Sequence, residues 1–296
     1  MAGNVFSGSE QLQRRIIGVT IVVILIIFAF FGVAESNDSA QKVFWAAVQN
    51  SMNTTAVTVG SSGSASGETE KVLSQLDFGQ HPTTQILTTL TSDGATAETE
   101  TLTTPSAEYT RYDSIHELMK GKPINFTSVI GLWAKTASYE GNIVPPTFAQ
   151  TLLGQLLPLP IGNLTASERA QFLSQIQNDQ IYTVNFSTAK KITYNGRLAY
   201  VYAVSIEPVL YLQLVKSYAP SVGMQEVSQL NPNDYDGESD VKATWTIDTK
   251  SKELVKADYG SGRVQTYTGW GVPITTVVPT HTVTAAQLQQ RLNKVI

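Results

Sequence analysis

The sequence contains no cysteine among its 296 residues. Disulfide bonds, thiolate catalysis and cysteine-ligated metal sites are therefore excluded. For an exported bacterial protein, the lipid-modified cysteine of a lipoprotein is excluded as well. A folded domain in this chain must be stable through its core alone, and an exported domain without disulfides is more typical of a bacterial envelope than of a eukaryotic secretory pathway.

Histidine is also scarce, with three residues in the chain. His81, His116 and His281 are each isolated, because no second histidine lies three or four residues away. A metal centre or a Ser-His-Asp triad would need convergence from distant segments, so these histidines favour ordinary surface positions. No phosphate-binding glycine loop and no nucleophile elbow occurs. We therefore expect a protein that is not an enzyme, with no catalytic residue, no metal site and no cofactor.

Charged residues make up 15% of the chain, and the net charge is −4. This balance gives no electrostatic reason to expect nucleic acid or an anionic membrane surface as a partner. The densest acidic stretch is residues 231–240, in which Asp234, Asp236 and Asp240 loosely resemble a calcium-binding loop. Pro232 stands where the first ligand of an EF-hand loop would be, so a solvated acidic loop is favoured over a calcium site.

One long apolar run, residues 16–34, contains no charge and has Thr20 as its only polar side chain. A helix of this length is roughly 28 Å long at about 1.5 Å per residue, close to the ~30 Å of bilayer hydrocarbon. Arg14 and Arg15 precede the run, so the positive-inside rule places the N-terminus in the cytoplasm. We predict a single-pass cell-membrane protein with a cytoplasmic tail (1–15), a transmembrane helix (16–34) and an extracytoplasmic domain (35–296).

A cleaved signal peptide is the alternative interpretation of the same run. Gly32-Val33-Ala34 offers small side chains at the positions that a signal peptidase reads. The apolar core is longer than the ~7 to 15 residues usual in a signal peptide, which favours a retained anchor. Under both interpretations, the chain is exported from about Glu35 onward.

The exported part alternates between strand and helix patterns. Its first half predicts a helix at 40–52 capped by Ser39, then a strand at 56–59 and a glycine- and serine-rich loop at 60–67. Three or four antiparallel strands follow within 71–114, and the strand at 95–104 has the polar character of an edge strand. A short helical piece is predicted at 114–119. A helical region at 126–181 then contains an apolar stripe at 148–157 and a capping box, Thr165 to Glu168, that begins a second helix.

The second half returns to strands. The sequence predicts a hairpin turn at Asn195-Gly196, followed by a central strand at 198–206 buried on both sides and a helix begun by Pro208. It then predicts a three-stranded meander at 241–248, 253–259 and 263–268, and a terminal helix capped by Thr284. No repeat or long linker divides these segments. We therefore predict one α+β domain.

The motifs in this second half follow a familiar order. Trp245-Thr-Ile-Asp248 precedes a Thr-Lys-Ser-Lys turn, Leu254-Val-Lys-Ala-Asp258 and Tyr267-Thr-Gly-Trp-Gly-Val-Pro273, and the upstream hairpin reads Asn195-Gly-Arg-Leu-Ala-Tyr200. This order resembles the LolA-like proteins and the LppX/LprG-like lipid carriers of the periplasmic lipoprotein-carrier superfamily, over most of residues 40–296. The chain lacks the lipobox cysteine of the lipoproteins, which fits a transmembrane helix in place of a lipid anchor.

The resemblance implies a curved antiparallel sheet, a half-barrel, whose concave side is covered by helices that leave a gap for acyl chains. It implies a protein that binds or carries a hydrophobic ligand, with lipid or lipoprotein as a partner in addition to the membrane. The residues implied to line the gap are Trp133, Phe148, Leu152, Leu153, Leu156, Phe172, Leu173, Ile176, Tyr200, Tyr202 and Trp245. The alternative is a ligand-free envelope module for interaction or sensing, in which these side chains fill the core and the threonine-rich strands form the contact surface.

Overall fold

The computed structural model describes residues 39–65, 67–79, 82–104, 106–119, 122–138, 160–222 and 231–295. The predicted cytoplasmic tail and the predicted membrane helix at 16–34 lie outside these residues, as does the apolar stripe at 148–157. Among the described residues, no helix combines the length and the apolar character needed to cross a bilayer. From Ser39 to Ile296 the chain forms one unit by its internal contacts.

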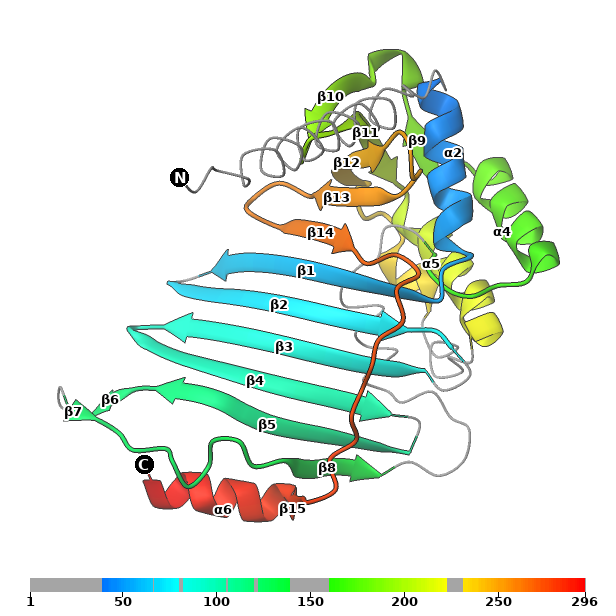
Figure 1. The fold of residues 1–296 in the computed structure, drawn as a ribbon. Helices are drawn as coiled ribbons and strands as arrows, with labels where there is room; N and C mark the ends of the chain where they lie inside the picture. Colours follow the sequence, from blue (N-terminus) through cyan, green and yellow to red (C-terminus); the bar gives the residue numbers. More distant parts are fainter. Residues whose placement is uncertain are drawn as a thin grey trace, which may run out of the picture. The chain divides into compact units, whose positions relative to one another are not determined.

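A 13-stranded sheet organises the described residues (Figure 1). Its strands are β1 (Ala56–Ala65), β2 (Glu68–Asp77), β3 (Thr83–Ser92), β4 (Ala95–Thr104), β5 (Ala107–His116), β8 (Ala134–Ser138), β9 (Tyr182–Val184), β10 (Lys190–Tyr194), β11 (Arg197–Ile206), β12 (Val241–Asp248), β13 (Leu254–Asp258), β14 (Val264–Thr268) and β15 (Val283–Thr284). A separate small hairpin joins β6 (Leu118–Met119) to β7 (Lys122–Pro123).

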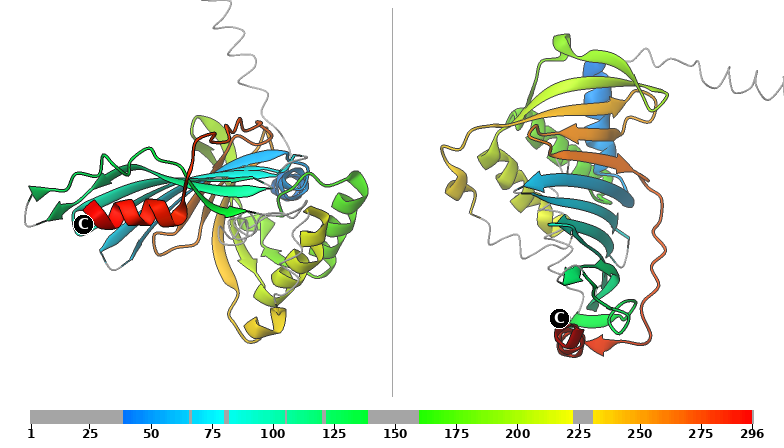
Figure 2. Two further views of the ribbon diagram at one scale, coloured as in Figure 1. Left: turned by 90° about the horizontal axis from the view of Figure 1, so that it is seen from below. Right: turned by 90° about the vertical axis from the view of Figure 1, so that its left-hand side faces the viewer.

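The strand order is β10-β11-β12-β13-β14-β1-β2-β3-β4-β5-β8-β15, and β9 pairs beside β10 on the outer edge of β11. Every described pair is antiparallel except β15 with β8, which is parallel. The sheet is curved and does not close on itself (Figure 2). The predicted α+β class with a curved open sheet is confirmed, with the correction that the sheet is mixed rather than wholly antiparallel.

The helices are α2 (Ala40–Ser51), α4 (Ala166–Asn178), α5 (Pro208–Tyr218) and α6 (Ala285–Val295), with 3-10 turns η1 (Phe186–Thr188), η2 (Ala219–Val222) and η4 (Pro232–Tyr235). Local signals predicted their starts correctly. Ser39 caps α2, and both hydrogen bonds of the Thr165–Glu168 capping box are present at α4. Pro208 occupies the first turn of α5, where a missing N–H costs nothing.

Two tight hairpins follow from their turn residues. Asn195 and Gly196 both have positive φ angles, 50° and 76°, as a two-residue type I′ turn requires. Asp93 and Gly94 have the same conformation, at 48° and 79°, between β3 and β4. The predicted turn at Asn195-Gly196 is confirmed.

The predicted loop at residues 60–67 is wrong. β1 continues to Ala65, because β2 pairs with it from Ala56 to Ala65 and β14 pairs with it on the other edge. An added Cβ at Gly60 would lie 2.9 Å from the Thr266 Oγ1 atom of β14. Gly60 therefore permits close packing of neighbouring strands and does not form a turn.

Two further local predictions fail between β4 and β6. Residues 95–104 do not form an edge strand, since β4 lies between β3 and β5. The predicted helical piece at 114–119 is extended: β5 runs to His116, and Leu118 pairs with Pro123. Pairing with neighbouring strands outweighs local propensity in both segments.

The two faces of the sheet carry different elements, as the right-hand view of Figure 2 shows. Helices α4 and α5 lie on one side, which we call the helix-covered face. Residues 269–282, which we call the strap, cross the other side, the strap face, from β14 to β15. Register separates the residues of the two faces: Leu76, Thr84 and Thr103 are cross-strand neighbours on the helix-covered face, whereas Gln85 and Leu102 are neighbours on the strap face.

Candidate functional site

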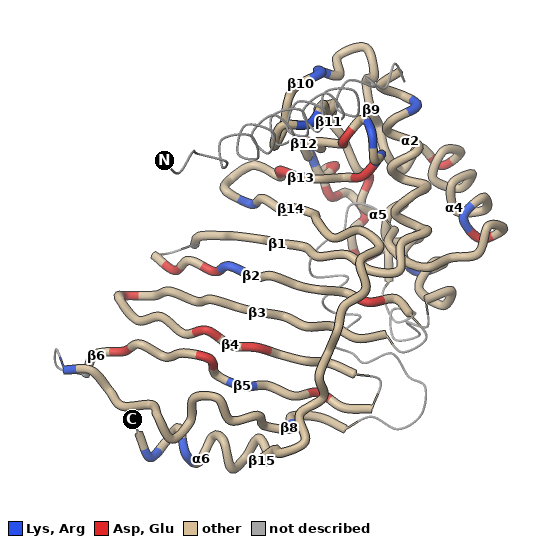
Figure 3. The backbone as a smooth tube through the Cα atoms, viewed as in Figure 1, with Lys and Arg blue, Asp and Glu red and all other residues tan. Residues whose placement is uncertain are grey.

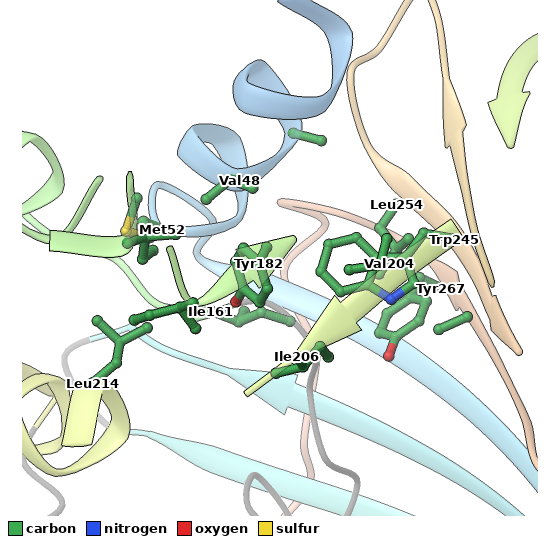
Figure 4. Close-up of a cluster of buried hydrophobic side chains, with 14 of the residues drawn as sticks. Val48, Met52, Ile161, Tyr182, Val204, Ile206, Leu214, Trp245, Leu254 and Tyr267 are labelled. Atoms are coloured by element: carbon green, nitrogen blue, oxygen red, sulfur yellow. The ribbon is translucent and has the colours of Figure 1, made fainter. Parts of the chain in front are cut away.

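Six of the predicted ligand-lining residues meet in the main core on the helix-covered face. Phe172, Ile176, Tyr202 and Trp245 are buried there, and Leu173 and Tyr200 pack against them while partly exposed. Figure 4 shows Trp245 close to Tyr182, Val204 and Leu254 in this core. Side chains from α4, β11 and β12 therefore converge, as the sequence-based hypothesis requires.

The centre of this core is aromatic and closely packed. The ring of Phe44 on α2 stacks on Trp245 with a centroid distance of 5.5 Å and an interplanar angle of 12°. Tyr202 and Tyr182 approach the same ring edge-on, at 5.4 and 6.3 Å. Trp245 is 0% exposed. These contacts show side chains filling the described space between α2 and β12, and a ligand-lining role for them stays a prediction.

The strand at 198–206 was predicted to be buried on both sides. Tyr202, Val204 and Ile206 are buried on the helix-covered face of β11, but Ala203, which faces the other way, is exposed. The prediction is therefore correct for the bulky side chains and wrong at Ala203, because no element covers β11 there in the described chain.

Of the other predicted lining residues, one lies elsewhere and four are outside the described residues. Phe148, Leu152, Leu153 and Leu156 are outside the described residues. Trp133 is on the strap face, where it packs against a small core formed by Leu102, Ala107 and Tyr109. The structure thus separates Trp133 from the aromatic core with which the sequence-based hypothesis grouped it.

A groove of about 650 Å³ lies between the strap and the strap face. Pockets that hold small molecules commonly have ~300 to 1,000 Å³. Its apolar lining comes from the sheet side and from the strap: Leu102, Leu132, Trp133, Val277, Val278 and Pro279. Its polar lining consists of Gln85, Glu100, Arg111, Thr275, Thr276, Thr280 and His281, together with Gly131. Both walls of the groove therefore carry apolar side chains, and Gln85, Glu100 and Arg111 form a polar region on the sheet wall.

The strap is attached at its two ends. At the first end, the Gly271 amide donates to the Ala56 carbonyl oxygen at 2.8 Å and to Thr54 Oγ1 at 3.0 Å. At the second end, the Val283 amide donates to the Trp133 carbonyl oxygen at 2.9 Å. Between these ends, residues 273–282 make no backbone–backbone hydrogen bond within the described chain. The middle of the strap therefore spans the groove without being part of the sheet.

A buried carboxylate organises the polar region. Glu100 is 6% exposed; its Oε1 accepts a hydrogen bond from Gln85 Nε2 at 2.5 Å, and its Oε2 lies 2.5 Å from Arg111 Nη2. Arg111 Nε also lies 2.7 Å from Asp113 Oδ1, and the guanidinium carbon is 4.7 Å from the centroid of the Trp133 ring. Figure 3 shows these charged positions along β4 and β5.

Burial raises the pKa of the Asp113 carboxyl above its ordinary value, and the positive charge of Arg111 offsets this effect only in part. Glu100 contributes to the rise by its negative charge. The network thus holds two carboxylates around one guanidinium. The carboxylate oxygens of this network can accept hydrogen bonds from a ligand. Within the described chain, no group of three or more metal-ligating side chains is present here or elsewhere.

Sequence reasoning named Trp133 but missed its polar neighbours. Gln85, Glu100 and Arg111 lie on three successive strands, and only strand register brings them together. The available signal was charge at interior strand positions, since Glu98 and Glu100 interrupt the threonine-rich β4 and Arg111 and Asp113 follow on β5.

Comparisons with known proteins point to a distant structural likeness. No protein-family model matches the chain, and no curated protein matches it. Among solved structures, it is similar to the crystal structure of LprF from Mycobacterium bovis, with a TM-score of 0.45 and 16% identity over 81% of this chain and 96% of that chain. The LprF match is a likeness only. It is too distant to carry a function across, so the residues of this chain must support one.

Proposed function

We propose that this protein binds a hydrophobic ligand bearing an acyl chain, on the extracytoplasmic side of the cell membrane. The groove beneath the strap is the observation that supports this proposal best. Its volume of about 650 Å³ and its two apolar walls suit a chain that enters lengthwise, and its polar region suits a headgroup. Burial of an acyl chain contributes about 0.8 kcal/mol per CH₂, so a chain held along these walls is retained without a covalent bond.

The proposal includes membrane attachment through a retained helix at residues 16–34. Its support is the uncharged run itself, with Arg14 and Arg15 before it. Such an anchor would keep the binding domain beside its lipid source. The proposed activity is binding or carriage, without catalysis.

The predicted gap between the sheet and the helices is a second place for the acyl chain. Its support is the apolar face of α4, where Phe172, Leu173 and Ile176 belong to or pack against the same core as Tyr202 of β11. The aromatic packing around Phe44 favours the groove as the first choice, because the groove is already open.

A long-chain alcohol that carries a photoactivatable group on its alkyl chain tests the proposal on the full-length protein in neutral detergent. We expect labelling to map to residues 131–133 and 275–281. Trp133→Ala should reduce that labelling several-fold, whereas Tyr235→Ala, which removes an exposed aromatic residue from η4, should not. Labelling confined to 16–34, or none at all, would contradict ligand binding by the domain. Labelling of 172–176 would instead favour the gap beneath the helices.

A second candidate function is a ligand-free interaction module. Leu73 and Leu87 are cross-strand neighbours on the strap face and are 40% and 39% exposed. Leu87 also pairs with Glu100 of the groove. This exposed apolar pair, together with the closely packed aromatic core, favours a protein contact if no acyl probe labels the domain.

A further inference from the structure

We infer that the groove selects its ligand by the charge of the polar group: it takes acyl ligands whose polar group is uncharged or cationic, such as an amide or an ammonium, and rejects anionic ones. This inference rests on the proposed function, because it concerns the headgroup of the ligand proposed for the same groove. It follows from the net charge of the side chains around Glu100, and from which of these side chains can still bind a ligand.

Around the polar region, three carboxylates outnumber two cationic side chains, although of these only Glu100 and Arg111 line the groove itself. Glu100 and Asp113 both contact Arg111, so two carboxylates face one guanidinium. Glu98 adds a third carboxylate on the same face of β4, where its Oε2 accepts a hydrogen bond from Ser114 Oγ at 2.9 Å. The negative charge of Glu98 also acts on Asp113 and raises its pKa. An anionic headgroup entering here meets net repulsion.

Arg111 is the one lysine or arginine among the described residues that line the groove. Lys135 stands on the same face, opposite Tyr109 in register; it is exposed and, like Glu98 and Asp113, does not line the groove. Direct charge pairing between an anion and a lysine or arginine would therefore depend on Arg111 alone.

Arg111 is already engaged on three sides. Its Nη2 pairs with Glu100, its Nε pairs with Asp113, and its flat face covers the Trp133 ring. A sulfonate or phosphate that took the guanidinium would separate it from Glu100, a carboxylate that is 6% exposed. Leaving a buried charge without its partner is strongly unfavourable. The charge of the guanidinium is therefore already balanced by two carboxylates, which leaves little attraction for an anion at its remaining N–H groups.

Hydrogen-bond donors on the ligand, in contrast to an anion, find acceptor sites at Glu100. An ionised carboxylate offers about four acceptor sites, and the contacts of Glu100 with Gln85 and Arg111 use only part of that capacity. The N–H groups of a primary amide match the remaining sites. A cation also gains from the excess of carboxylates.

Three photoactivatable probes with one acyl chain and different permanent headgroups test the inference on the full-length protein in neutral detergent. The headgroups are a primary amide, a quaternary ammonium and a sulfonate. We expect the amide and the ammonium probes to half-saturate labelling of residues 131–133 and 275–281 at concentrations lower than the sulfonate by on the order of fivefold or more.

Single substitutions assign this discrimination to its source. Glu100→Gln and Asp113→Asn should each shrink the disadvantage of the sulfonate, and a thermal melt shows whether each variant is folded. Asp113→Asn is the safer variant, because the Asp113 side chain is 31% exposed. Glu70→Gln is the matched control, since Glu70 is an exposed carboxylate on the other face of the sheet, and it should leave the discrimination unchanged.

Equal or better labelling by the sulfonate would overturn the inference while leaving acyl binding intact. Unchanged discrimination in a folded Asp113→Asn protein would likewise overturn it, because the selection would then not arise from these carboxylates. Labelling of the groove by none of the three probes would contradict the proposed function and the inference with it.

Discussion

The Val283 amide donates to the Trp133 carbonyl oxygen at 2.9 Å, so the strap ends on the residue whose side chain lines the groove. The same residue lies under the guanidinium of Arg111. The end of the strap, the apolar wall and the charged network therefore meet at one position on the strap face.

Truncation of two tryptophans should have different effects on stability and on acyl labelling. Trp245→Ala removes a fully buried ring stacked on Phe44, so we expect it to lower the free energy of unfolding by about 3–5 kcal/mol. Trp133→Ala removes a partly buried ring, and we expect a loss of roughly 1–2 kcal/mol together with loss of acyl labelling in the groove. Urea denaturation of both variants measures the difference. Equal losses would mean that Trp133 is a core residue.

Replacing Thr84 or Thr103 by Val should stabilise the protein. The two residues are directly opposite one another on β3 and β4, each 0% exposed, and neither hydroxyl has a hydrogen-bond partner among the described residues. Removing a buried unsatisfied hydroxyl should raise the free energy of unfolding by about 1 kcal/mol. Thr101→Val is the matched control on the same face of β4, because its hydroxyl lies 3.4 Å from that of Thr110. A gain in the control as large as in Thr84→Val would attribute the effect to β-propensity.

Alkaline pH should destabilise the fold steeply. Burial raises the pKa of the Tyr182, Tyr218 and Tyr267 hydroxyls well above their ordinary value of 10.0. The folded state then holds these protons more tightly than the unfolded state. Their contribution to stability is complete below pH 10 and is lost as the pH rises above it, by about 1.4 kcal/mol per pH unit for each tyrosine.

Urea midpoints measured from neutral to strongly alkaline pH, with tyrosinate absorbance followed in parallel, would show this dependence. We expect tyrosinate from the buried residues to appear together with unfolding. Ionisation of all tyrosines near pH 10 in a protein that remains folded would contradict the burial of these three side chains.

Calcium should not stabilise the domain through the acidic loop. Asp234 Oδ1 accepts a hydrogen bond from Asn231 Nδ2 at 2.7 Å, whereas Asp240 Oδ2 is bound to Ser205 and Lys242 at 2.5 and 3.2 Å. The two carboxylates thus have different partners. Melting temperatures with calcium and with chelator should agree. A rise of several degrees that Asp234→Asn abolishes would establish a site.

Protease added to intact cells should digest residues 35–296 and spare residues 1–15. The reason is the basic pair, Arg14 and Arg15, before the apolar run. Protein in lysed cells is the control for protease access. Survival of the domain in intact cells would reverse the proposed orientation, and a mature N-terminus near Glu35 would replace the retained anchor with a cleaved signal peptide.

The parts of the fold predicted correctly from sequence depend on local chemistry. Ser39, the Thr165–Glu168 box and Pro208 set helix starts, and Asn195-Gly196 sets a hairpin, because each requires only residues a few positions apart. The glycine and serine run after Gly60 was misread, since its strand conformation depends on pairing with β14, whose residues come about 200 positions later.

The groove was harder to predict than the aromatic core. Phe172, Tyr202 and Trp245 are bulky residues in strongly patterned segments, so their convergence follows from apolar periodicity. Glu100 looks like a surface residue in sequence, and only the register that sets it between Gln85 and Arg111 explains its burial. The strap offers no periodic signal, because residues 273–282 belong to no helix or strand.

The pairing of β1 with β14 also determines when the domain can be completed. Gly60 and Thr266, which meet across this pair, are 206 residues apart. While the chain is being synthesised, β1 to β5 can form a meander early, but the outer edge of β1 stays open until the last third of the chain has emerged. Such long-range closure is slow, and an open edge invites pairing with other chains. The nascent protein therefore passes through a period in which shielding of this edge decides between folding and aggregation.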